Sequence, residues 1–579
     1  MKYKISNLKP SIFAEASAGK QISNLVKILL KNRGIKTKKE IEEFLNPKLK
    51  NVTIESVGID KKQLKIAIER IKLAIENKEQ IVVFGDYDVD GICGTAILWE
   101  TLRRLAPQGK LYENVFPYIP HRIDEGYGLS IKGITNIINK YDNVKLIVTV
   151  DNGIVANKAV EFANEQGIDV IITDHHVPSR KLPDALVIVH TTKLCGAGVA
   201  YLLAQELRME NGKWKMENLE HLELVALATV ADLVPLKGSS RTLLKFGLEQ
   251  LRKTQRIGLL ELFKEAGLTK ESIGVYEIGH MIAPRLNAMG RLEYAMDSLR
   301  LICTNNPKRA EELAQLLGST NKERQDVTLQ AVLHAVEKVS TSSRPAGLRG
   351  ASKTQKKLLF VVDESYEQGV IGLVAGKLVE EFYRPAIVIS KGKKFSKASA
   401  RSIKGFDMIQ FIRTASEFLV DAGGHPMAAG FTVETAKLPL LQKALESRAE
   451  SLLNKELLTR SLRIDCELPL SLINLDLYEA LQKLAPFGMG NPEPTFISKN
   501  VVVEDIRLVG AEGKHLKLNF KFQISNFKFG RLEGIAFGMG QSSKIHINDK
   551  IDIAYTIDED EWNGEKRLQL KIKEIKTLK

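Results

Sequence analysis

Three short apolar stretches in the first third of the chain each end in acidic or histidine side chains. They cover residues 81–84 (IVVF), 145–150 (KLIVTV) and 169–173 (DVIIT). Short apolar runs separated by helix-like segments are typical of β-α-β units, whose strands form a parallel sheet. The pattern therefore predicts an α/β domain, which we place at residues 61–300.

Helical spacing of apolar residues dominates two other regions. The first 80 residues predict helices, including an N-terminal helical segment at 1–60. Residues 301–340 predict a connecting helix, either continuous or broken near Gly318. Residues 341–357 follow it with basic and small polar residues and little apolar content, so we expect a disordered basic insertion there. A flexible surface loop is favoured over a DNA contact for this insertion.

The last 120 residues change to a strand pattern. Charged residues alternate with apolar ones in five stretches, at 500–510, 515–523, 533–539, 549–559 and 566–576. Five short strands fit an OB-fold β-barrel, which we place at 456–579 and which holds single-stranded nucleic acid by charge and aromatic stacking. Candidate stacking residues are Phe520, Phe522, Phe527 and Phe529. Phenylalanines in such strands are more often barrel core, and both interpretations stay open.

Composition and charge narrow the class of protein. The chain has 579 residues, of which 44% are apolar and 27% charged, so we expect a globular protein with several domains. A net charge of +14 favours a polyanionic partner, although a solvated lysine-rich surface explains it equally well. The four cysteines form no CxxC pair, which argues against a disulfide framework and structural zinc. We expect a cytoplasmic protein without signal peptide or membrane span.

The acidic and histidine residues gather at points that a parallel sheet brings together. They are Asp86, Asp88, Asp90, Asp151, Asp174, His175, His176 and, at the end of a helix-like stretch, Asp232. The carboxyl ends of parallel strands share one edge, where ligands bind. A lone aspartate after a strand is usually a helix cap, but a helix needs one cap rather than three alternating aspartates. Since crowded carboxylates repel one another unless a cation neutralises them, we predict a metal site.

The ligand types indicate which metal this site would hold. Carboxylates with imidazole suit Mn²⁺ or Mg²⁺ better than metals that prefer thiolates. There are more carboxylates than one ion requires, which indicates two ions sharing a ligand. Paired ions of this kind serve in the hydrolysis of phosphoesters.

The acidic motifs resemble those of the DHH phosphoesterases. The segments GDYDVDG at 85–91, DNG at 151–153 and DHH at 174–176, followed by Asp232, match that family in order and approximate spacing. Within the family, later segments resemble the bacterial single-strand-specific 5′ to 3′ DNA exonucleases. These segments are APRLNAMGR at 283–291, SARSIKGFD at 399–407, DAGGHPMAAGF at 421–431 and LAPFGMGNPEPTF at 484–496.

The resemblance implies a fold and a role for each candidate residue. The fold is a parallel-sheet DHH domain, a second α/β substrate-binding lobe of DHHA1 type at 358–455 joined by a long helix, and the C-terminal OB-fold barrel. The implied ligands of two Mn²⁺ or Mg²⁺ ions are Asp88, Asp90, Asp151 as the bridge, His175 and Asp232. Asp86, Asp174 and His176 are the implied catalytic residues. The implied substrate-binding residues are Arg285, Asn287, Arg291, Ser399, Arg401, Ser402, Gly423, Gly424 and His425.

The implied activity is metal-dependent 5′ to 3′ hydrolysis of single-stranded DNA to mononucleotides, in DNA repair and recombination. A monomer is implied, with a RecQ-type helicase and a single-strand-binding protein as candidate partners. One alternative is a phosphodiesterase of short oligoribonucleotides or cyclic dinucleotides, and another is a non-catalytic Cdc45-like replication scaffold. The chain departs from the exonuclease pattern at Tyr366 and Glu367, where Trp-His is common, and at Lys377, where arginine is frequent. These departures put substrate preference in doubt, but not the metal ligands.

Overall fold

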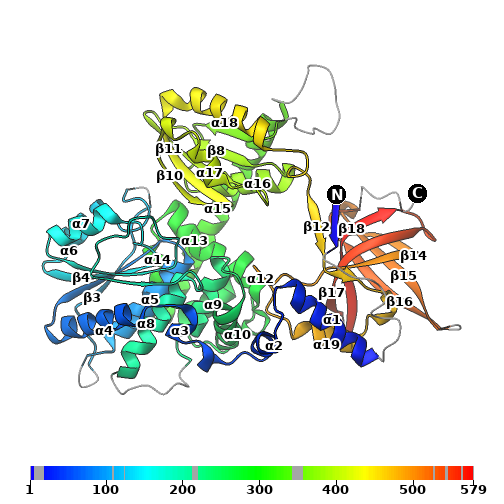
Figure 1. The fold of residues 1–579 in the computed structure, drawn as a ribbon, viewed down its shortest axis with the longest axis horizontal. Helices are drawn as coiled ribbons and strands as arrows, with labels where there is room; N and C mark the ends of the chain where they lie inside the picture. Colours follow the sequence, from blue (N-terminus) through cyan, green and yellow to red (C-terminus); the bar gives the residue numbers. More distant parts are fainter. Residues whose placement is uncertain are drawn as a thin grey trace. The chain divides into compact units, whose positions relative to one another are not determined.

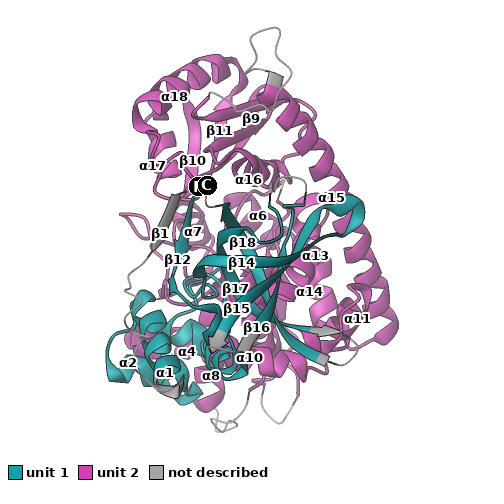
Figure 2. Cartoon of the chain, turned by 90° about the vertical axis from the view of Figure 1, so that its right-hand side faces the viewer, with its two compact units in different colours: residues 1–51, 233–242, 461–579 teal, residues 52–232, 243–460 magenta. Residues whose placement is uncertain are grey.

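The computed structural model describes residues 2–5, 18–106, 110–122, 124–210, 219–341, 356–525, 528–540, 545–562 and 565–577 (Figure 1). The chain forms two compact units (Figure 2). The large unit comprises residues 52–232 and 243–460, and the terminal unit comprises residues 1–51, 233–242 and 461–579. Within the described ranges, no helix has both the length and the apolar character needed to cross a bilayer.

The large unit contains the predicted parallel sheet, with the strand order β3-β2-β4-β5-β6. The strands are β2 (Gln80–Gly85), β3 (Val115–Tyr118), β4 (Val144–Val150), β5 (Asp169–Asp174) and β6 (Val187–His190). Side chains of α6 (Ile131–Lys140) and α7 (Asn157–Glu165) pack with one face of the sheet in a common core. Side chains on the opposite face, such as Val83 and Val148, are also fully buried. Burial on both faces explains the uninterrupted apolar runs of the sequence.

Successive connections of the sheet run to opposite sides of β2, so the topological switch point lies between β2 and β4. From β2 the chain moves to β3 on one side, and β4 then pairs with the other side of β2. The connections that leave β2 and β4 therefore diverge, and in open α/β sheets ligands bind at the carboxyl ends of strands at such a switch point. Asp86 follows β2 and Asp151 follows β4, so both residues lie at this switch point.

The large unit contains further helices. They are α3 (Ile54–Val57), α4 (Lys61–Glu76), α5 (Val89–Arg103), α8 (Gly196–Glu210), α9 (Leu222–Ala231), α10 (Gly238–Arg252, of which residues 238–242 belong to the terminal unit), α11 (Ile257–Glu265), α12 (Val275–Glu277), α13 (Ala283–Leu292), α14 (Met296–Cys303) and α15 (Pro307–Thr341). The expected connecting helix corresponds to α15, which runs through Gly318 without a break. The expected basic insertion at 341–357 falls almost entirely on residues 342–355, which lie outside the described residues.

The second lobe of the large unit is built on a mixed sheet with the order β10-β11-β9-β8-β7. Its strands are β7 (Leu359–Asp363), β8 (Ala386–Ser390), β9 (Phe395–Arg401), β10 (Leu419–His425) and β11 (Ala428–Glu434), and its helices are α16 (Ile371–Phe382), α17 (Met408–Arg413) and α18 (Leu438–Leu452). Only β7 and β8 pair in parallel. The lobe is therefore α/β, as expected, and carries two sequence motifs on β9 and β10.

The terminal unit contains a closed five-stranded barrel, which confirms the predicted OB-fold. Its strands are β14 (Phe496–Val509), β15 (His515–Ser525), β16 (Lys528–Ala536), β17 (Lys550–Trp562) and β18 (Glu565–Thr577), and β14 closes the barrel by pairing with β17. Helices α1 (Ala18–Asn32), α2 (Lys38–Leu45) and α19 (Leu475–Gln482) belong to the same unit. The N-terminus departs from the helical expectation, because β1 (Lys2–Ile5) forms a strand that pairs with β12 (Ser461–Ile464).

The candidate stacking residues of the barrel divide into two groups. Phe520 is fully buried in the barrel core, so the stacking interpretation is wrong for this residue. Phe522 packs against the same core and is partly buried. Phe527 and the side chain of Phe529 lie outside the described residues.

Candidate metal centre

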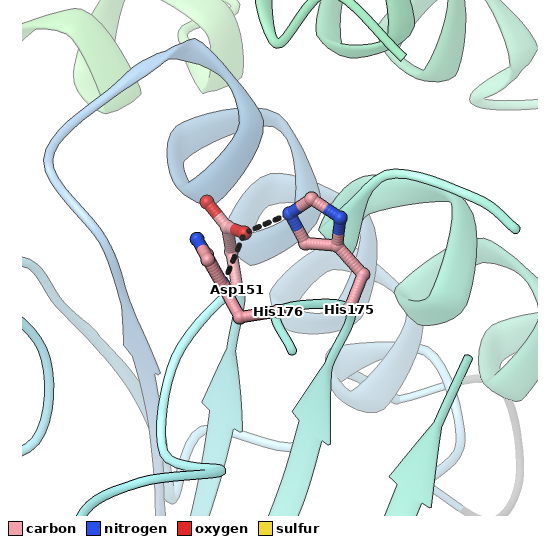
Figure 3. Close-up of side chains that lie close together, drawn as sticks. All are labelled: Asp151, His175 and His176. Carbon is pink, nitrogen blue, oxygen red and sulfur yellow. Dashed lines mark ion pairs between the residues drawn. The ribbon is translucent and has the colours of Figure 1, made fainter. Parts of the chain in front are cut away.

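Acidic residues from three separate segments converge on one imidazole at the carboxyl edge of the parallel sheet. His175 Nε2 lies 3.0 Å from Asp151 Oδ1, 3.6 Å from Asp90 Oδ2 and 3.5 Å from Asp232 Oδ2. Figure 3 shows Asp151 at the end of its strand with the side chains of His175 and His176 beside it. Residues separated by up to 142 positions in the chain (90 to 232) thus meet at the predicted edge.

Three overlapping groups of side chains place their ligand atoms within 4.8 Å of one another. These groups are Asp86, Asp88 and Asp151; Asp90, His175 and Asp232; and Asp151, His175 and His176. Asp151 and His175 each belong to two of the groups. Because a carboxylate has two oxygens that can each contact an ion, the bridging role that the resemblance implies for Asp151 stays a prediction.

Backbone N–H groups at helix starts hold two of the aspartates in position. Asp88 caps α5, because its Oδ1 accepts hydrogen bonds from the backbone N–H groups of Asp90 at 3.0 Å and Gly91 at 3.1 Å. The Asp90 carboxylate accepts from the N–H groups of Gly196 at 2.6 Å and Ala197 at 2.7 Å, at the start of α8. A helix start favours a negative charge, so these bonds lower the cost of the crowded carboxylates.

Asp151 is held by its backbone rather than by hydrogen bonds to its side chain. Its φ is +62°, a left-handed conformation that is uncommon for residues other than glycine. The adjacent Asn152 side chain donates to the carbonyls of Phe84 at 3.3 Å and Val150 at 2.8 Å, which ties together the ends of β2 and β4. A Cβ on Gly196 would lie 2.6 Å from Asp151 Cβ, so the close approach of α8 requires a glycine.

Asp174 orients the two histidines instead of facing the other acids. Its carboxylate accepts hydrogen bonds from the backbone N–H groups of Ile154 at 2.9 Å, His175 at 2.6 Å and His176 at 3.1 Å. It also accepts from His176 Nδ1 at 2.8 Å, and His176 Nε2 lies 3.1 Å from the Tyr127 hydroxyl. With its oxygens occupied in this way, Asp174 supports the ligands as a positioning residue.

Burial and mutual repulsion set the protonation of the cluster. Burial, followed by repulsion from Asp88, raises the pKa of Asp90 to about 7. Burial and repulsion from Asp90 raise the pKa of Asp232 to about 8, and the pKa values of Asp86 and Asp151 are raised for the same two kinds of reason. Burial lowers the pKa of His175 to about 4, so its imidazole is neutral at pH 7 and can act as a ligand. Burial opposes protonation of His176, but the hydrogen bond to Asp174 prevails and raises its pKa to about 9.

Two buried atoms indicate that the cluster accommodates a cation. Among the described residues, Asp151 Oδ1 and His175 Nε2 are buried without a hydrogen-bond partner, although they lie 3.0 Å apart. Buried polar atoms normally have a partner, and a divalent ion is one that both atoms can share. Oxygen and imidazole donors without thiolates fit Mn²⁺ or Mg²⁺.

Arginines gather around the start of α16 in the second lobe. Arg401 Nη1 donates to Ser399 Oγ at 3.2 Å, and Arg291 Nη1 donates to the Gly369 carbonyl at 3.0 Å. A Cβ on Gly372 would lie 3.0 Å from both Arg401 Nη2 and Ser399 Oγ, so the first turn of the helix comes close to this pair. Burial lowers the pKa of Arg291 to about 10, and repulsion from Arg122, Arg324 and Arg401 contributes. This concentration of positive charge fits an anionic group.

Three other residues expected to bind the substrate have partners within the protein. Arg285 pairs with Glu265, and Asn287 Oδ1 accepts a hydrogen bond from Val89 N–H at 3.0 Å, which makes Asn287 a support of the acidic loop. The burial of Ser402 argues against the substrate contact expected of it. This residue is 4% exposed, and its hydroxyl donates to the Phe406 carbonyl at 2.6 Å.

The motif at the end of β10 reaches the histidines of the metal cluster. The ring of His425 stacks on that of His176 with the ring centres 6.0 Å apart. Gly423 and Gly424 precede it and are exposed, and Gly424 has a φ of +133°. Sequence reasoning missed Arg122 and Tyr127, since each stands in a loop without a motif of its own, and folding alone places Arg122 near Arg291 and Tyr127 beside His176.

Comparisons with known proteins agree with this geometry. Family models match residues 80–229 (DHH family, N-terminal domain), 355–451 (DHHA1 domain) and 464–574 (RecJ OB domain). The chain is 36% identical to the single-stranded-DNA-specific exonuclease RecJ of Bacillus subtilis, covering 96% of this chain and 68% of that protein. It is 31% identical to the protein of the same name from Salmonella typhimurium, covering 95% of each.

A solved structure shares the fold. The crystal structure of RecJ from Thermus thermophilus in complex with Mn²⁺ superposes with a TM-score of 0.81 at 27% identity, covering 100% of this chain and 80% of that one. The three matched domains, the closed barrel and the long-range identity confirm the resemblance stated from the sequence. Because that identity extends over nearly the whole chain and more than two thirds of each of these relatives, the chain belongs to the RecJ family.

Proposed function

We propose that the protein is a metal-dependent exonuclease that hydrolyses single-stranded DNA from the 5′ end to mononucleotides. The observation that carries this proposal is the convergence of Asp90, Asp151 and Asp232 on His175 Nε2 within 3.6 Å, at the switch point of a parallel sheet. The names of the related proteins supply the substrate class. DNA repair and recombination are the processes that need such an activity.

The proposed ligands of two Mn²⁺ or Mg²⁺ ions are Asp88, Asp90, Asp151, His175 and Asp232, with Asp151 shared. When bound, such ions lower the pKa of a water and stabilise charge on the leaving oxygen. Asp174 accepts a hydrogen bond of 2.8 Å from His176 Nδ1, and a substrate phosphate would compete with the Tyr127 hydroxyl, 3.1 Å away, for the N–H at His176 Nε2. Asp86 completes the acidic wall beside Asp88.

The arginine cluster explains why the proposed exonuclease would act at the 5′ end of a strand. A terminal 5′-phosphate carries more negative charge than an internal phosphodiester, and guanidinium groups with a helix start bind such a group strongly. Arg401, Ser399 and Arg291 supply the donors that the sequence predicted, and Arg122 and the start of α16 add to them. Recognition of the chain end beside the metal cluster accounts for release of one nucleotide at a time.

The polarity of digestion tests this proposal directly. A single strand of about 30 nucleotides is labelled at its 5′ end or at its 3′ end. With Mn²⁺, we expect labelled mononucleotide to appear at once from the 5′-labelled strand and only late from the 3′-labelled strand. The same sequence as a blunt duplex serves as the control and is expected to resist. Immediate release from the 3′ end contradicts the proposal.

Replacement of Arg401 by Gln tests the phosphate contact. A hydrogen bond to a charged group contributes about 2 kcal/mol, so digestion of a 5′-phosphorylated strand should slow about thirtyfold, whereas a 5′-hydroxyl strand should lose much less. Lys404→Gln is the matched control, because Lys404 is an exposed cation three residues along the same segment. An equal loss on both substrates would assign Arg401 to folding rather than to the phosphate.

Two other functions are less well supported. A Cdc45-like scaffold has no need of an intact ligand set, and all five proposed ligands are present here. A nuclease of short oligoribonucleotides or cyclic dinucleotides has no need of a closed OB barrel. A monomer, cytoplasmic location and a RecQ-type helicase with single-strand-binding protein as partners remain part of the proposal.

A further inference from the structure

A cavity of the large unit lies away from the metal cluster. Its volume is about 550 Å³, within the range of pockets that hold small-molecule ligands. The ends of α5, α10 and α14 and the residues around the start of α9 line it, and every lining residue belongs to the large unit. Asp90 and Asp232 stand at the opposite ends of α5 and α9, about 14 Å along the helix from the lining residues Trp99 and Glu223.

The acidic side chains of the cavity already have cationic partners. Glu100 accepts hydrogen bonds from Arg256 Nη1 and Nη2, each at 2.8 Å. Glu223 accepts from Arg256 Nε at 2.7 Å, and Glu220 forms an ion pair with Arg104. None of the three acids is therefore left to attract a cationic ligand.

Two cations of the cavity are available to a ligand instead. The three acids pair with other groups, which leaves Arg103 and Lys253 without an acidic partner among the described residues. Lys253 is exposed, and the Arg103 guanidinium lies over the Trp99 ring, 4.9 Å from its centre. Guanidinium and ammonium groups that lack a partner attract an anion, and phosphate suits both of them.

The other lining groups suit the ring of a nucleobase. Bases stack on aromatic rings and on guanidinium groups alike, and the Trp99–Arg103 pair offers both. Leu111 is 52% exposed and adds apolar surface to the same wall. The side-chain amides of Gln250 and Asn305 carry donors and acceptors, which the edge of a base requires. A stacking surface, amides and free cations together are the chemistry that binds a nucleotide.

We propose that this cavity is a second, non-catalytic binding site for a 5′-mononucleotide, with the phosphate at Arg103 and Lys253 and the base against Trp99. The choice of ligand rests on the proposed function, because digestion releases mononucleotides beside the enzyme. A mononucleotide held here touches none of the proposed metal ligands, so product and DNA can be bound at the same time.

Tryptophan fluorescence of the full-length protein tests the site, with EDTA present so that no metal supports binding elsewhere. We expect deoxyadenosine 5′-monophosphate to quench the fluorescence saturably. Trp99→Phe should remove most of this change, because stacking places the base beside the indole. Lys253→Gln should weaken the binding about tenfold, the loss expected when one charged hydrogen bond is removed. Because Lys253 is exposed, this variant should unfold at the wild-type temperature.

Arg252→Gln is the matched control for Lys253→Gln. Arg252 is the exposed cation next to Lys253, but it donates to the Ile273 carbonyl at 2.9 Å and does not line the cavity. It should bind the mononucleotide like the wild type. Arg401→Gln should also leave the quenching unchanged, which separates this cavity from the arginine cluster near the metals.

Three results would overturn the inference. They are absence of quenching up to about 10 mM mononucleotide, equal affinity in Lys253→Gln and the wild type, and loss of quenching in Arg401→Gln. Inorganic phosphate, which has no base, should compete about tenfold more weakly than the mononucleotide, and equal competition would contradict the assignment to a nucleotide. Failure of Mn²⁺-dependent digestion would overturn the proposed function and leave this metal-free binding result as it stands.

Discussion

Replacing Asp151 by Asn should abolish Mn²⁺-dependent digestion of single-stranded DNA, with a loss of about a thousandfold or more in rate, equivalent to about 4 kcal/mol of transition-state stabilisation. The side chain keeps its size but loses the charge of the one aspartate that belongs to two of the ligand groups. Asp151 is 2% exposed, so the replacement changes the charge of a buried position. Digestion of a 5′-labelled strand measures the effect.

The unfolding temperature of the same variant distinguishes the loss of a ligand charge from damage to the fold. In the metal-free protein, Asp151 is a buried carboxylate repelled by Asp90, so Asp151→Asn should raise the unfolding temperature in the presence of EDTA. Asp142→Asn is the matched control, since Asp142 is exposed two residues before the start of the same strand and should change neither activity nor stability. Wild-type digestion by Asp151→Asn would remove the proposed bridge.

Mn²⁺ should stabilise the protein, and it should do so more strongly at pH 8 than at pH 6. The folded-state pKa values of Asp90 and Asp232, about 7 and about 8, lie above the value of about 3.9 expected in the unfolded chain. The folded metal-free protein therefore binds protons that the unfolded chain has lost. This contribution to stability is fully present below about pH 4 and disappears as the pH rises through 7 and 8.

Metal ions replace those protons as the neutralising charge. At pH 6 the ions must displace protons from Asp90 and Asp232, whereas at pH 8 much less proton displacement is needed. Saturation at a hundred times the dissociation constant adds about 2.7 kcal/mol to the free energy of unfolding. Thermal unfolding with and without Mn²⁺ at the two pH values measures the difference, and Asp151→Asn should show almost no increment. An increment that is larger at pH 6 would contradict the protonation states described above.

Local patterns of apolar and charged residues were sufficient to predict most of the architecture. Apolar runs bounded by turn residues predicted the parallel sheet, because its strands are buried on both faces. Alternating charged and apolar residues predicted the barrel, because its strands are buried on one face only. The same reasoning could not predict β1, since residues 2–5 form a strand only by pairing with residues 461–464. Nor could it separate core from surface for Phe520, because both faces of a barrel strand tolerate phenylalanine.

The sequence by itself determined which residues could bind metal, because crowded aspartates and adjacent histidines after buried strands have few other uses. Only the tertiary structure decided which atoms meet: that His175 Nε2 faces three aspartates, that Asp174 is occupied by hydrogen bonds, that Ser402 is buried, and that Arg122 joins Arg291 and Arg401. The physical reason is that chemical type is a property of each residue, whereas distance depends on strand order and loop conformation. Those are set by packing between residues far apart in the chain.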